Sequence, residues 1–246
     1  MRGRTRPLTL SQRLAVDLLR FVIGVPSHTE RMRLNLSAVA AARAQSAARP
    51  RWMTIFVKAY AMVANEIPDL RRAYLGLPRP HFYEYPTSIA MFVLDREHDG
   101  EKFHFNYTVP DPAALSLAEI DRRITHALER PIEQVREYRR AVTVARLPTP
   151  LRRFLMWLAY NLGRQRPKYF GTFAVTTHTE GRLSGLLCAW TTRLSYGRLA
   201  DDGTMDVRVA VDHRVIDGPT GERALLRLQE ILNGPIADEL RGGAVR

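Results

Sequence analysis

A chain of 246 residues, 46% of them hydrophobic and 25% charged, can bury the core of one large globular domain. Its one cysteine, Cys188, excludes an intrachain disulfide and any metal site built from several cysteines. The N-terminus lacks the apolar stretch of a signal peptide, and no uncharged apolar run approaches the roughly 18–20 residues of a membrane span. We therefore expect a cytoplasmic protein in which Cys188 is buried and unreactive.

The formal net charge of +12 is carried almost entirely by arginine, since only three of the 37 basic residues are lysines. A charge of this size favours association with anions such as nucleic acid, acidic membranes or phosphorylated cofactors. The arginines are scattered, and no RNA-recognition, zinc-finger or basic-zipper pattern accompanies them. We expect nucleic acid not to be a partner, while a peripheral membrane contact stays open.

The first half of the chain alternates between helix and strand patterns. A helix is predicted over residues 7–23, with Thr9 or Ser11 as its N-cap and one apolar face. Alternating apolar and polar residues predict a half-buried strand over 31–37. Further patterns follow in the order helix, helix, strand, strand, over residues 37–47, 52–67, 87–94 and 102–109.

The second half begins and ends with a helix. Ser116 and Glu119 form a capping box for a helix predicted over 116–135, which Pro131 is expected to kink. Three strands follow, over residues 171–178, 184–196 and 204–212. The last helix is predicted over 219–232, with Gly234 after its end. This order predicts a single domain of the α+β class, with helices covering one face of a mixed β-sheet.

Residues 147–169 form an unusual segment, because its central helix pattern has almost no polar face and basic residues flank it. The apolar residues are Phe154, Leu155, Met156, Trp157, Leu158, Tyr160 and Leu162. Such a helix packs against the sheet or a neighbouring subunit, or it forms a lid or interfacial helix on anionic lipid head groups. The sequence leaves both alternatives open.

The stretch VDHRVIDGPT, residues 211–220, places a histidine where a strand ends and a helix begins. His213 is therefore either a solvent-exposed loop residue or a general base held at an element boundary. The glycine patterns of Rossmann and Walker sites are absent, as are the H-E-x-x-H and G-x-S-x-G motifs. Enzymes that depend on these motifs are therefore disfavoured. The choice between the two roles of His213 depends on whether the stretch around it matches a known catalytic motif.

The segment DHRVIDG resembles the H-x-x-x-D-G motif of chloramphenicol acetyltransferases. It is still more similar to the D-H-R-x-x-[DN]-G of the dihydrolipoyl acyltransferase catalytic domains of 2-oxoacid dehydrogenase complexes. The resemblance continues in PLTLSQRLAVDLL, MRLNLSAVAAAR, TIFVKAYAMVANEIPDLRRAY and ALLRLQEILNGP, and covers nearly all of the chain except residues 140–168. It implies a chloramphenicol acetyltransferase-like fold, with one catalytic domain over 1–246 and an insertion-like helical segment at about 147–169.

The resemblance also implies a set of catalytic residues. His213 would act as the general base, a role that suits an imidazole with a pKa near ~6.5. Thr176, in GTFAVT, takes the place of the family's hydroxyl donor to the oxyanion, with Thr177 as the fallback. Asp217 would support the site through a polar network or cap the last helix. Arg13 and Arg214 are candidate partners for Asp217 or for a phosphate group, or they are surface charges. No metal is expected.

By the same resemblance, an acyl-CoA would donate its acyl group directly to a hydroxyl, thiol or amine acceptor in a ternary complex. The expected assembly is a homotrimer without a larger shell, in which His213 of one subunit faces Thr176 of its neighbour. The catalytic domain begins within ten residues of Met1, so we expect neither a lipoyl domain, with its covalently attached lipoyl group, nor a peripheral-subunit-binding domain. The resulting hypothesis is a stand-alone acyltransferase. The alternative is a catalytically idle scaffold related to dehydrogenase-complex cores.

Overall fold

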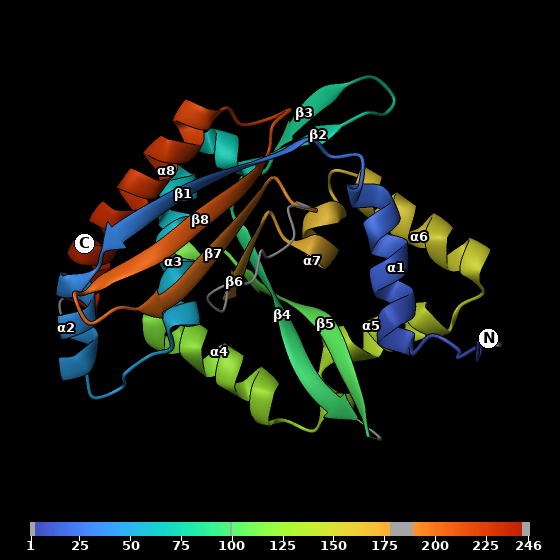
Figure 1. The fold of residues 1–246 in the computed structure, drawn as a ribbon, viewed down its shortest axis with the longest axis horizontal. Coiled ribbons are helices and arrows are strands. Elements are labelled where there is room, and N and C mark those ends of the chain that lie inside the picture. The colour runs from blue at the N-terminus through green and yellow to red at the C-terminus, as the bar shows by residue number, and fades with distance from the viewer. Residues whose placement is uncertain (1–2, 99, 178–188, 243–246) are drawn as a thin grey trace.

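Six strands form one mixed sheet in the computed structural model, which describes residues 3–98, 100–177 and 189–242 (Figure 1). The order across the sheet is β1-β8-β7-β6-β4-β5, and β6 runs parallel to both of its neighbours while the other pairs are antiparallel. The bounds are β1 (Ser27–Asn35), β4 (Ile89–His98), β5 (Glu101–Pro110), β6 (Phe173–Thr177), β7 (Thr192–Leu199) and β8 (Thr204–Asp212). A separate two-stranded sheet pairs β2 (Arg72–Leu75) with β3 (His81–Glu84).

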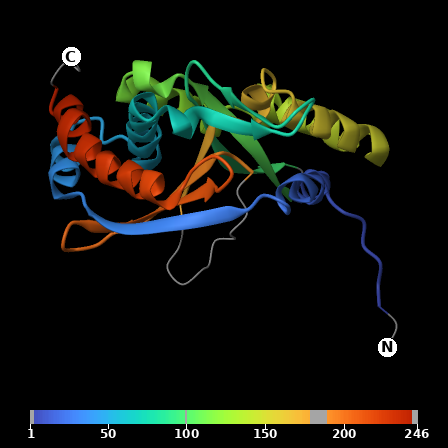
Figure 2. The same cartoon turned by 90° about the horizontal axis from the view of Figure 1, so that it is seen from above.

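One face of the sheet is covered by helices, as Figure 2 shows. These are α2 (Ser37–Gln45), α3 (Trp52–Glu66), α4 (Leu117–Glu129) and α8 (Gly218–Ile231). α3 is buried on nearly all sides because its sequence is apolar all round; Phe56 stacks on Tyr196 with ring centroids 4.3 Å apart. Tyr60 meets Phe173 edge-on at 5.0 Å, so α3 joins two neighbouring strands. The α+β class and the mixed, one-side-covered sheet are thus confirmed.

The predicted helix starts are confirmed where a side chain caps the helix. In α1 (Leu10–Val22), the Thr9 hydroxyl accepts from the backbone N–H of Gln12 at 3.2 Å, and the Gln12 side chain accepts from the Thr9 N–H at 3.0 Å. Ser116 likewise accepts from the backbone N–H of Glu119 at 3.1 Å at the start of α4, but only this half of the predicted capping box forms, because the Glu119 carboxylate accepts from Arg122 and Arg123. Each cap satisfies an amide that the first turn of a helix leaves without a partner.

The single kinked helix predicted over 116–135 is wrong. α4 ends at Glu129, because Pro131 favours an extended conformation of Arg130, whose φ is −61° and ψ 151°. A short 3-10 turn (Ile132–Gln134) then leads to a second helix, α5 (Arg136–Arg146), that the sequence did not predict. α5 is rich in arginine and buries only Tyr138 and Ala145, so its apolar pattern is weak.

Other boundaries also differ from the prediction: the strand expected over 31–37 spans Ser27–Asn35, and the strand expected over 87–94 spans Ile89–His98. The strand expected over 184–196 begins only at Thr192; residues 184–188, including Cys188 and its expected burial, lie outside the described residues. The last helix does not stop at Gly234 but continues through a π-helical turn (Leu232–Ile236) into α9 (Ala237–Leu240). Tertiary contacts maintain this continuation, since the Glu239 carboxylate pairs with buried Lys58 and accepts from the Leu117 N–H at 2.6 Å.

The unusual segment 147–169 forms two helices, α6 (Thr149–Asn161) and α7 (Arg166–Phe170). α6 packs mainly against α1 and α7 at one end of the molecule, and Arg152, Met156 and Tyr160 point inward. Its outer face is open, with Phe154 56% exposed. The alternative in which the sheet buries this helix is therefore wrong for that face. Among the described residues, no helix combines the length and apolarity needed to cross a membrane.

Candidate active site

The turn that carries His213 is held by backbone hydrogen bonds from two elements. β8 ends at Asp212, and the next residue donates its N–H to the carbonyl of Pro26, just before β1, at 2.8 Å. The N–H groups of Val215 and Ile216 both bond to the Asp212 carbonyl, at 2.9 and 3.0 Å. The turn is thus tied to the end of the sheet before α8 begins, and the position of the histidine is fixed by its backbone.

One hydrogen bond sets the chemical state of the His213 ring. Nδ1 lies 3.0 Å from the carbonyl oxygen of Ile216. A carbonyl oxygen can only accept, so Nδ1 carries a hydrogen, and in the neutral form of the ring the lone pair is on Nε2. The side chain lies at the surface of the single chain. This arrangement presents a base at Nε2 to a molecule arriving from outside.

Asp212 and Arg214, the residues on either side of His213, form a tight pair. Asp212 is 2% exposed, and its carboxylate accepts from Arg214 Nε at 2.9 Å, from an Arg214 terminal nitrogen at 2.7 Å and from the Arg214 N–H at 3.1 Å. The hydrogen bonds that Arg214 donates to the Asp212 carboxylate raise the pKa of the Arg214 guanidinium, against the effect of burial. Of the alternatives for the two arginines, Arg214 thus pairs with Asp212 rather than with Asp217, and Arg13 donates to the carbonyl of Leu8 at 3.3 Å.

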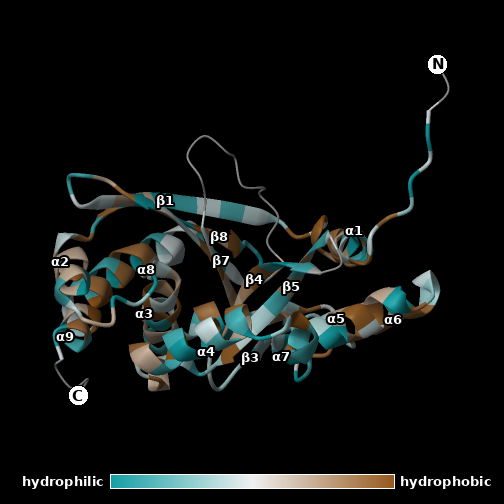
Figure 3. Cartoon of the chain, turned by 90° about the horizontal axis from the view of Figure 1, so that it is seen from below, coloured by the Kyte–Doolittle hydropathy of each residue, from teal (hydrophilic) through white to brown (hydrophobic). Residues whose placement is uncertain are grey.

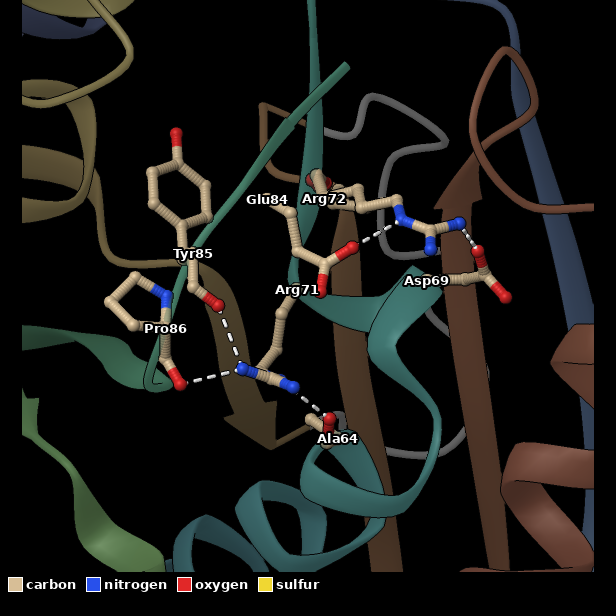
Figure 4. A network of polar contacts seen from close by, with 8 residues as sticks. Ala64, Asp69, Arg71, Arg72, Glu84, Tyr85 and Pro86 are labelled. Carbon is tan, nitrogen blue, oxygen red and sulfur yellow. Dashed lines mark hydrogen bonds and ion pairs between the residues drawn. The ribbon is translucent and has the colours of Figure 1, made fainter.

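The two-stranded sheet β2–β3 packs against the pair of Asp212 and Arg214. The Arg214 guanidinium lies 4.4 Å from the centre of the Tyr74 ring on β2, and the Thr191 hydroxyl donates to the carbonyl of Arg72. Figure 4 shows how this sheet is attached: Arg71 donates to the carbonyls of Ala64, Tyr85 and Pro86 at 2.7–2.8 Å. Arg72 itself bridges Glu84 and Asp69. Three segments that are distant in sequence therefore meet beside His213.

A second histidine, which the sequence did not place at the site, lies beside the first. The rings of His28 and His213 have centroids 5.6 Å apart, and His28 Nε2 is 2.7 Å from a carboxylate oxygen of Glu30. The pairing of β1 with β8 brings them together, because His28 stands opposite Val211. Sequence reasoning missed His28, Tyr74 and Thr191 because only strand register and tertiary packing reveal them.

Asp217 caps the last helix, one of the two roles predicted for it. Its carboxylate accepts from the backbone N–H of Thr220 at 3.0 Å at the start of α8. Hydrogen bonds from Thr220 lower the pKa of this exposed carboxyl group. The cap fixes where α8 starts, and with it the end of the turn that carries His213.

Thr176 and His213 are not brought together within one chain. Thr176 on β6 stands opposite Ser195 on β7, which stands opposite Arg208 on β8, five positions before His213. At ~3.3 Å per residue and ~5 Å between strands, the two groups are roughly 19 Å apart. Thr176 is half-buried and its hydroxyl donates to the Thr177 carbonyl at 3.3 Å, while Thr177 is exposed at the strand end. Any reaction that uses both groups needs a second copy of the chain.

Two clefts in the described part of the molecule lie away from these residues. The larger, about 560 Å³, separates α1 from the α5–α6 connection and is lined by Arg13, Arg146, Arg152 and Arg153 among others. The second, about 480 Å³, lies near Ser116 and Glu239. Neither cleft is lined by His213, Asp217 or Thr176, so neither identifies residues that would bind the acyl donor. Residues 3–98, 100–177 and 189–242 contain no cluster of three or more His, Cys, Asp or Glu side chains suited to a metal ion.

Comparison with known proteins gives matches in structure only. No family model matches the sequence, and no curated protein does either. A probable dihydrolipoamide acetyltransferase from Listeria monocytogenes shares the fold with a TM-score of 0.63 and 13% identity, covering 99% of each chain. The dihydrolipoamide acetyltransferase of Azotobacter vinelandii gives 0.65 and 17%, covering 97% of this chain and 94% of its own.

A chloramphenicol acetyltransferase also shares the fold, with a TM-score of 0.53 and 14% identity, covering 92% of this chain and 94% of its own. The predicted likeness to this group of catalytic domains is thus confirmed at the level of the fold. Identities of this size establish architecture, so the activity has to be argued from the residues of this chain.

Proposed function

We propose that this protein is an acyltransferase that moves an acyl group from an acyl-CoA thioester to a hydroxyl, thiol or amine acceptor. His213 is the general base. The observation that carries the proposal is the position of His213, exposed in a turn that backbone hydrogen bonds fix to the end of the sheet, with Nδ1 held against the carbonyl of Ile216 so that Nε2 is the nitrogen available to an acceptor.

The proposed reaction needs only this one base, because the proton taken from the acceptor is returned to the leaving group. His213 Nε2 takes the proton from the acceptor as the acceptor's oxygen, sulfur or nitrogen attacks the thioester carbonyl carbon. The tetrahedral intermediate then collapses, the carbon–sulfur bond breaks, and the CoA thiolate takes the proton from Nε2 to leave as the thiol. The ring returns to its starting state, and no covalent acyl-enzyme forms.

The oxyanion of that intermediate requires a hydrogen-bond donor already in place. We assign this role to the Thr176 hydroxyl of a neighbouring subunit, because the separation of about 19 Å within one chain excludes the chain's own Thr176. The assembly is a closed homotrimer with active sites between its subunits. In support, a relative with the same fold forms the cubic core of the pyruvate dehydrogenase multienzyme complex.

The spacing of functional residues in a structural relative also supports the proposal. The Azotobacter structure was determined to investigate a serine, a histidine and an asparagine in the catalytic mechanism. Its histidine and asparagine are four residues apart, as are His213 and Asp217 here. Its serine precedes the histidine by 52 residues, whereas Thr176 precedes His213 by 37, so the connection between the two groups is shorter in this chain.

The alternative is an idle scaffold of the same fold. A scaffold would need only the sheet and its helical cover, and would not require an exposed histidine in a turn that backbone hydrogen bonds fix to the end of the sheet. The pairing of Asp212 with Arg214 also fixes the turn that carries His213. Measured turnover of an acyl-CoA would distinguish the acyltransferase from the scaffold.

The test is the release of free CoA from a panel of acyl-CoA thioesters, offered with cell extract as the source of acceptors. His213→Ala should lower turnover at least ~10²–10⁴-fold, the usual contribution of a general base. His81→Ala is a matched control, because Nδ1 of exposed His81 also faces a carbonyl oxygen, that of Arg79, at 2.7 Å. Equal turnover by folded His213→Ala protein, or none by the wild type, would refute the proposed activity.

A further inference from the structure

Helix α6 carries an apolar outer face that no part of the chain described by the structure covers. Five large apolar side chains on it or directly after it are between 38% and 56% exposed: Leu151, Phe154, Leu155, Trp157 and Leu162. The rings of Phe154 and Trp157 stack, with centroids 6.3 Å apart and planes at 19°. In Figure 3 α6 projects at the edge of the molecule, beyond the sheet and its helical cover. These residues are called the α6 face below.

The opposite side of the same helix is firmly attached, so the α6 face is a built surface. Arg152 Nε lies 2.6 Å and Arg153 Nε 2.8 Å from the two carboxylate oxygens of Asp17 on α1. Tyr160 stacks on Phe21 of α1 at 6.1 Å and meets Phe170 of α7 edge-on at 5.8 Å. The inward residues recur every four positions, as a helix docked along one side requires.

The surroundings of the α6 face are positively charged. Residues 138–177 contain eight arginines and lysines and neither an aspartate nor a glutamate. Of these cations, Arg146 lies before the N-terminal end of α6, and Arg164 and Lys168 lie after its C-terminal end, all exposed. Apolar side chains between two groups of cations match the composition of a helix that lies in the surface of an anionic membrane.

We propose that the α6 face docks on an anionic membrane surface, with Phe154 and Trp157 entering the interface and Arg146, Arg164 and Lys168 contacting lipid head groups. The helix has 13 residues, about 20 Å, and lies in the membrane plane because it is too short to span it. This inference does not depend on the proposed activity.

Two other occupants fit the α6 face less well. One helix face about 20 Å long and 10 Å wide offers roughly 200 Å², far below the ~800 Å² per partner of a stable contact between two copies. Nucleic acid would contact the cations but would leave the leucine side chains in water. A lipid surface is the one occupant that uses both the apolar side chains and the charges around them.

The test is co-sedimentation with vesicles of phosphatidylcholine alone and of phosphatidylcholine mixed with phosphatidylglycerol. Wild-type protein should bind only the mixed vesicles. Phe154→Ser/Trp157→Ser should weaken that binding at least ~10-fold, since two large apolar side chains no longer enter the interface. Phe82→Ser/Leu226→Ser is the matched control, because these side chains are 55% and 47% exposed elsewhere and should leave binding unchanged. Leu151→Ser/Leu155→Ser repeats the test with different side chains.

A second pair of variants tests the charges. Arg164→Gln/Lys168→Gln should weaken binding by about fivefold for each cation removed, whereas Arg198→Gln/Arg223→Gln, with the same loss of charge elsewhere, should have a much smaller effect. Circular dichroism and light scattering establish that each variant keeps its fold and assembly. The proposal is overturned by wild-type protein that binds neither vesicle, by serine variants that bind as well as wild type, or by dissociation of the assembly in the serine variants. RNA binding without vesicle binding also overturns it.

Discussion

Asp17 of α1 and Arg152 of α6 form an ion pair whose side chains are 1% and 5% exposed. Asp17→Asn would leave the buried guanidinium without its charge partner, and breaking a buried pair from one side costs about 3–5 kcal/mol. We therefore expect a loss of that size in the free energy of unfolding by urea at pH 7. Glu230→Gln, which breaks the exposed pair with Arg227, should change it by no more than about 1 kcal/mol. Equal effects of the two substitutions would show that the Asp17 pair is energetically unimportant.

The same carboxylate predicts a pH dependence. Burial acts to raise the pKa of Asp17, but hydrogen bonds and charge from Arg153 and Arg152 outweigh it and hold the pKa below its ordinary value. A lowered pKa means that the stabilisation is complete above the unfolded-state pKa of about 3.9 and is lost as the pH falls through the lower folded-state pKa. The difference in stability between wild type and Asp17→Asn should therefore be constant from pH 7 to about 5 and shrink below about 4. A difference that stays constant down to pH 2 would contradict the lowered pKa.

Gly171 occupies a backbone conformation that other residues rarely adopt, at the junction of α7 and β6. Its φ is 69° and its ψ 179°, and an added Cβ would lie 2.7 Å from the carbonyl oxygen of Ile89. Gly171→Ala should lower the free energy of unfolding by at least about 1–3 kcal/mol. At Gly24 an added Cβ meets nothing within 4 Å, so Gly24→Ala should change it by less than about 0.5 kcal/mol. Thermal and urea unfolding measure both.

The elements that the sequence predicted correctly are those with a strong local pattern. The apolar helix α3 and the alternating strand β8 needed no knowledge of the rest of the fold, and Thr9 and Ser116 marked helix starts. α5 was missed because few of its side chains are buried, and the turn after Ile231 was mistaken for an end because Gly234 and Pro235 usually stop helices. Packing against α2, α3 and α8 overrides that local preference.

The candidate site also contains residues that the sequence motif identified and residues that only the folded structure reveals. The sequence motif gave His213 and Asp217, and the cap at Asp217 follows from its position before a helix. The motif also contained Asp212 and Arg214, but their pairing with each other depends on how the turn folds. His28 and Tyr74 come from distant parts of the chain, so only the register of β1 with β8 and the packing of β2 place them near His213.

The proposed role of the Thr176 hydroxyl can be tested by comparing substitutions of Thr176 and Thr177. Thr176→Val keeps the shape of the side chain and removes the donor, so it should lower kcat roughly 10²–10³-fold if the hydroxyl meets the oxyanion. Thr177→Val is the matched control: alternation along β6 points its side chain to the opposite face of the sheet. A loss of kcat seen only in Thr177→Val would mean that Thr177, and not Thr176, is the donor to the oxyanion. Little loss in either variant would remove the threonine donor from the mechanism.

Assembly of the site from two subunits predicts complementation between inactive variants. His213→Ala and Thr176→Val subunits are co-expressed with different tags, and mixed assemblies are purified by their two tags. In a closed trimer that contains both kinds of subunit, one of the three interfaces joins a functional histidine to a functional threonine, so about a third of wild-type activity should return.

A site formed within a single chain gives a different result. No subunit of the mixture would then contain both groups, and activity would stay at the average of the two variants alone. The double variant His213→Ala/Thr176→Val mixed with wild type is the control, because it dilutes wild-type subunits without creating new complementary pairs. Multi-angle light scattering should give three times the 28.1 kDa mass of the chain for every mixture. An active species at the monomer mass would refute the shared site, because the roughly 19 Å between Thr176 and His213 exceeds the reach of one reacting carbonyl.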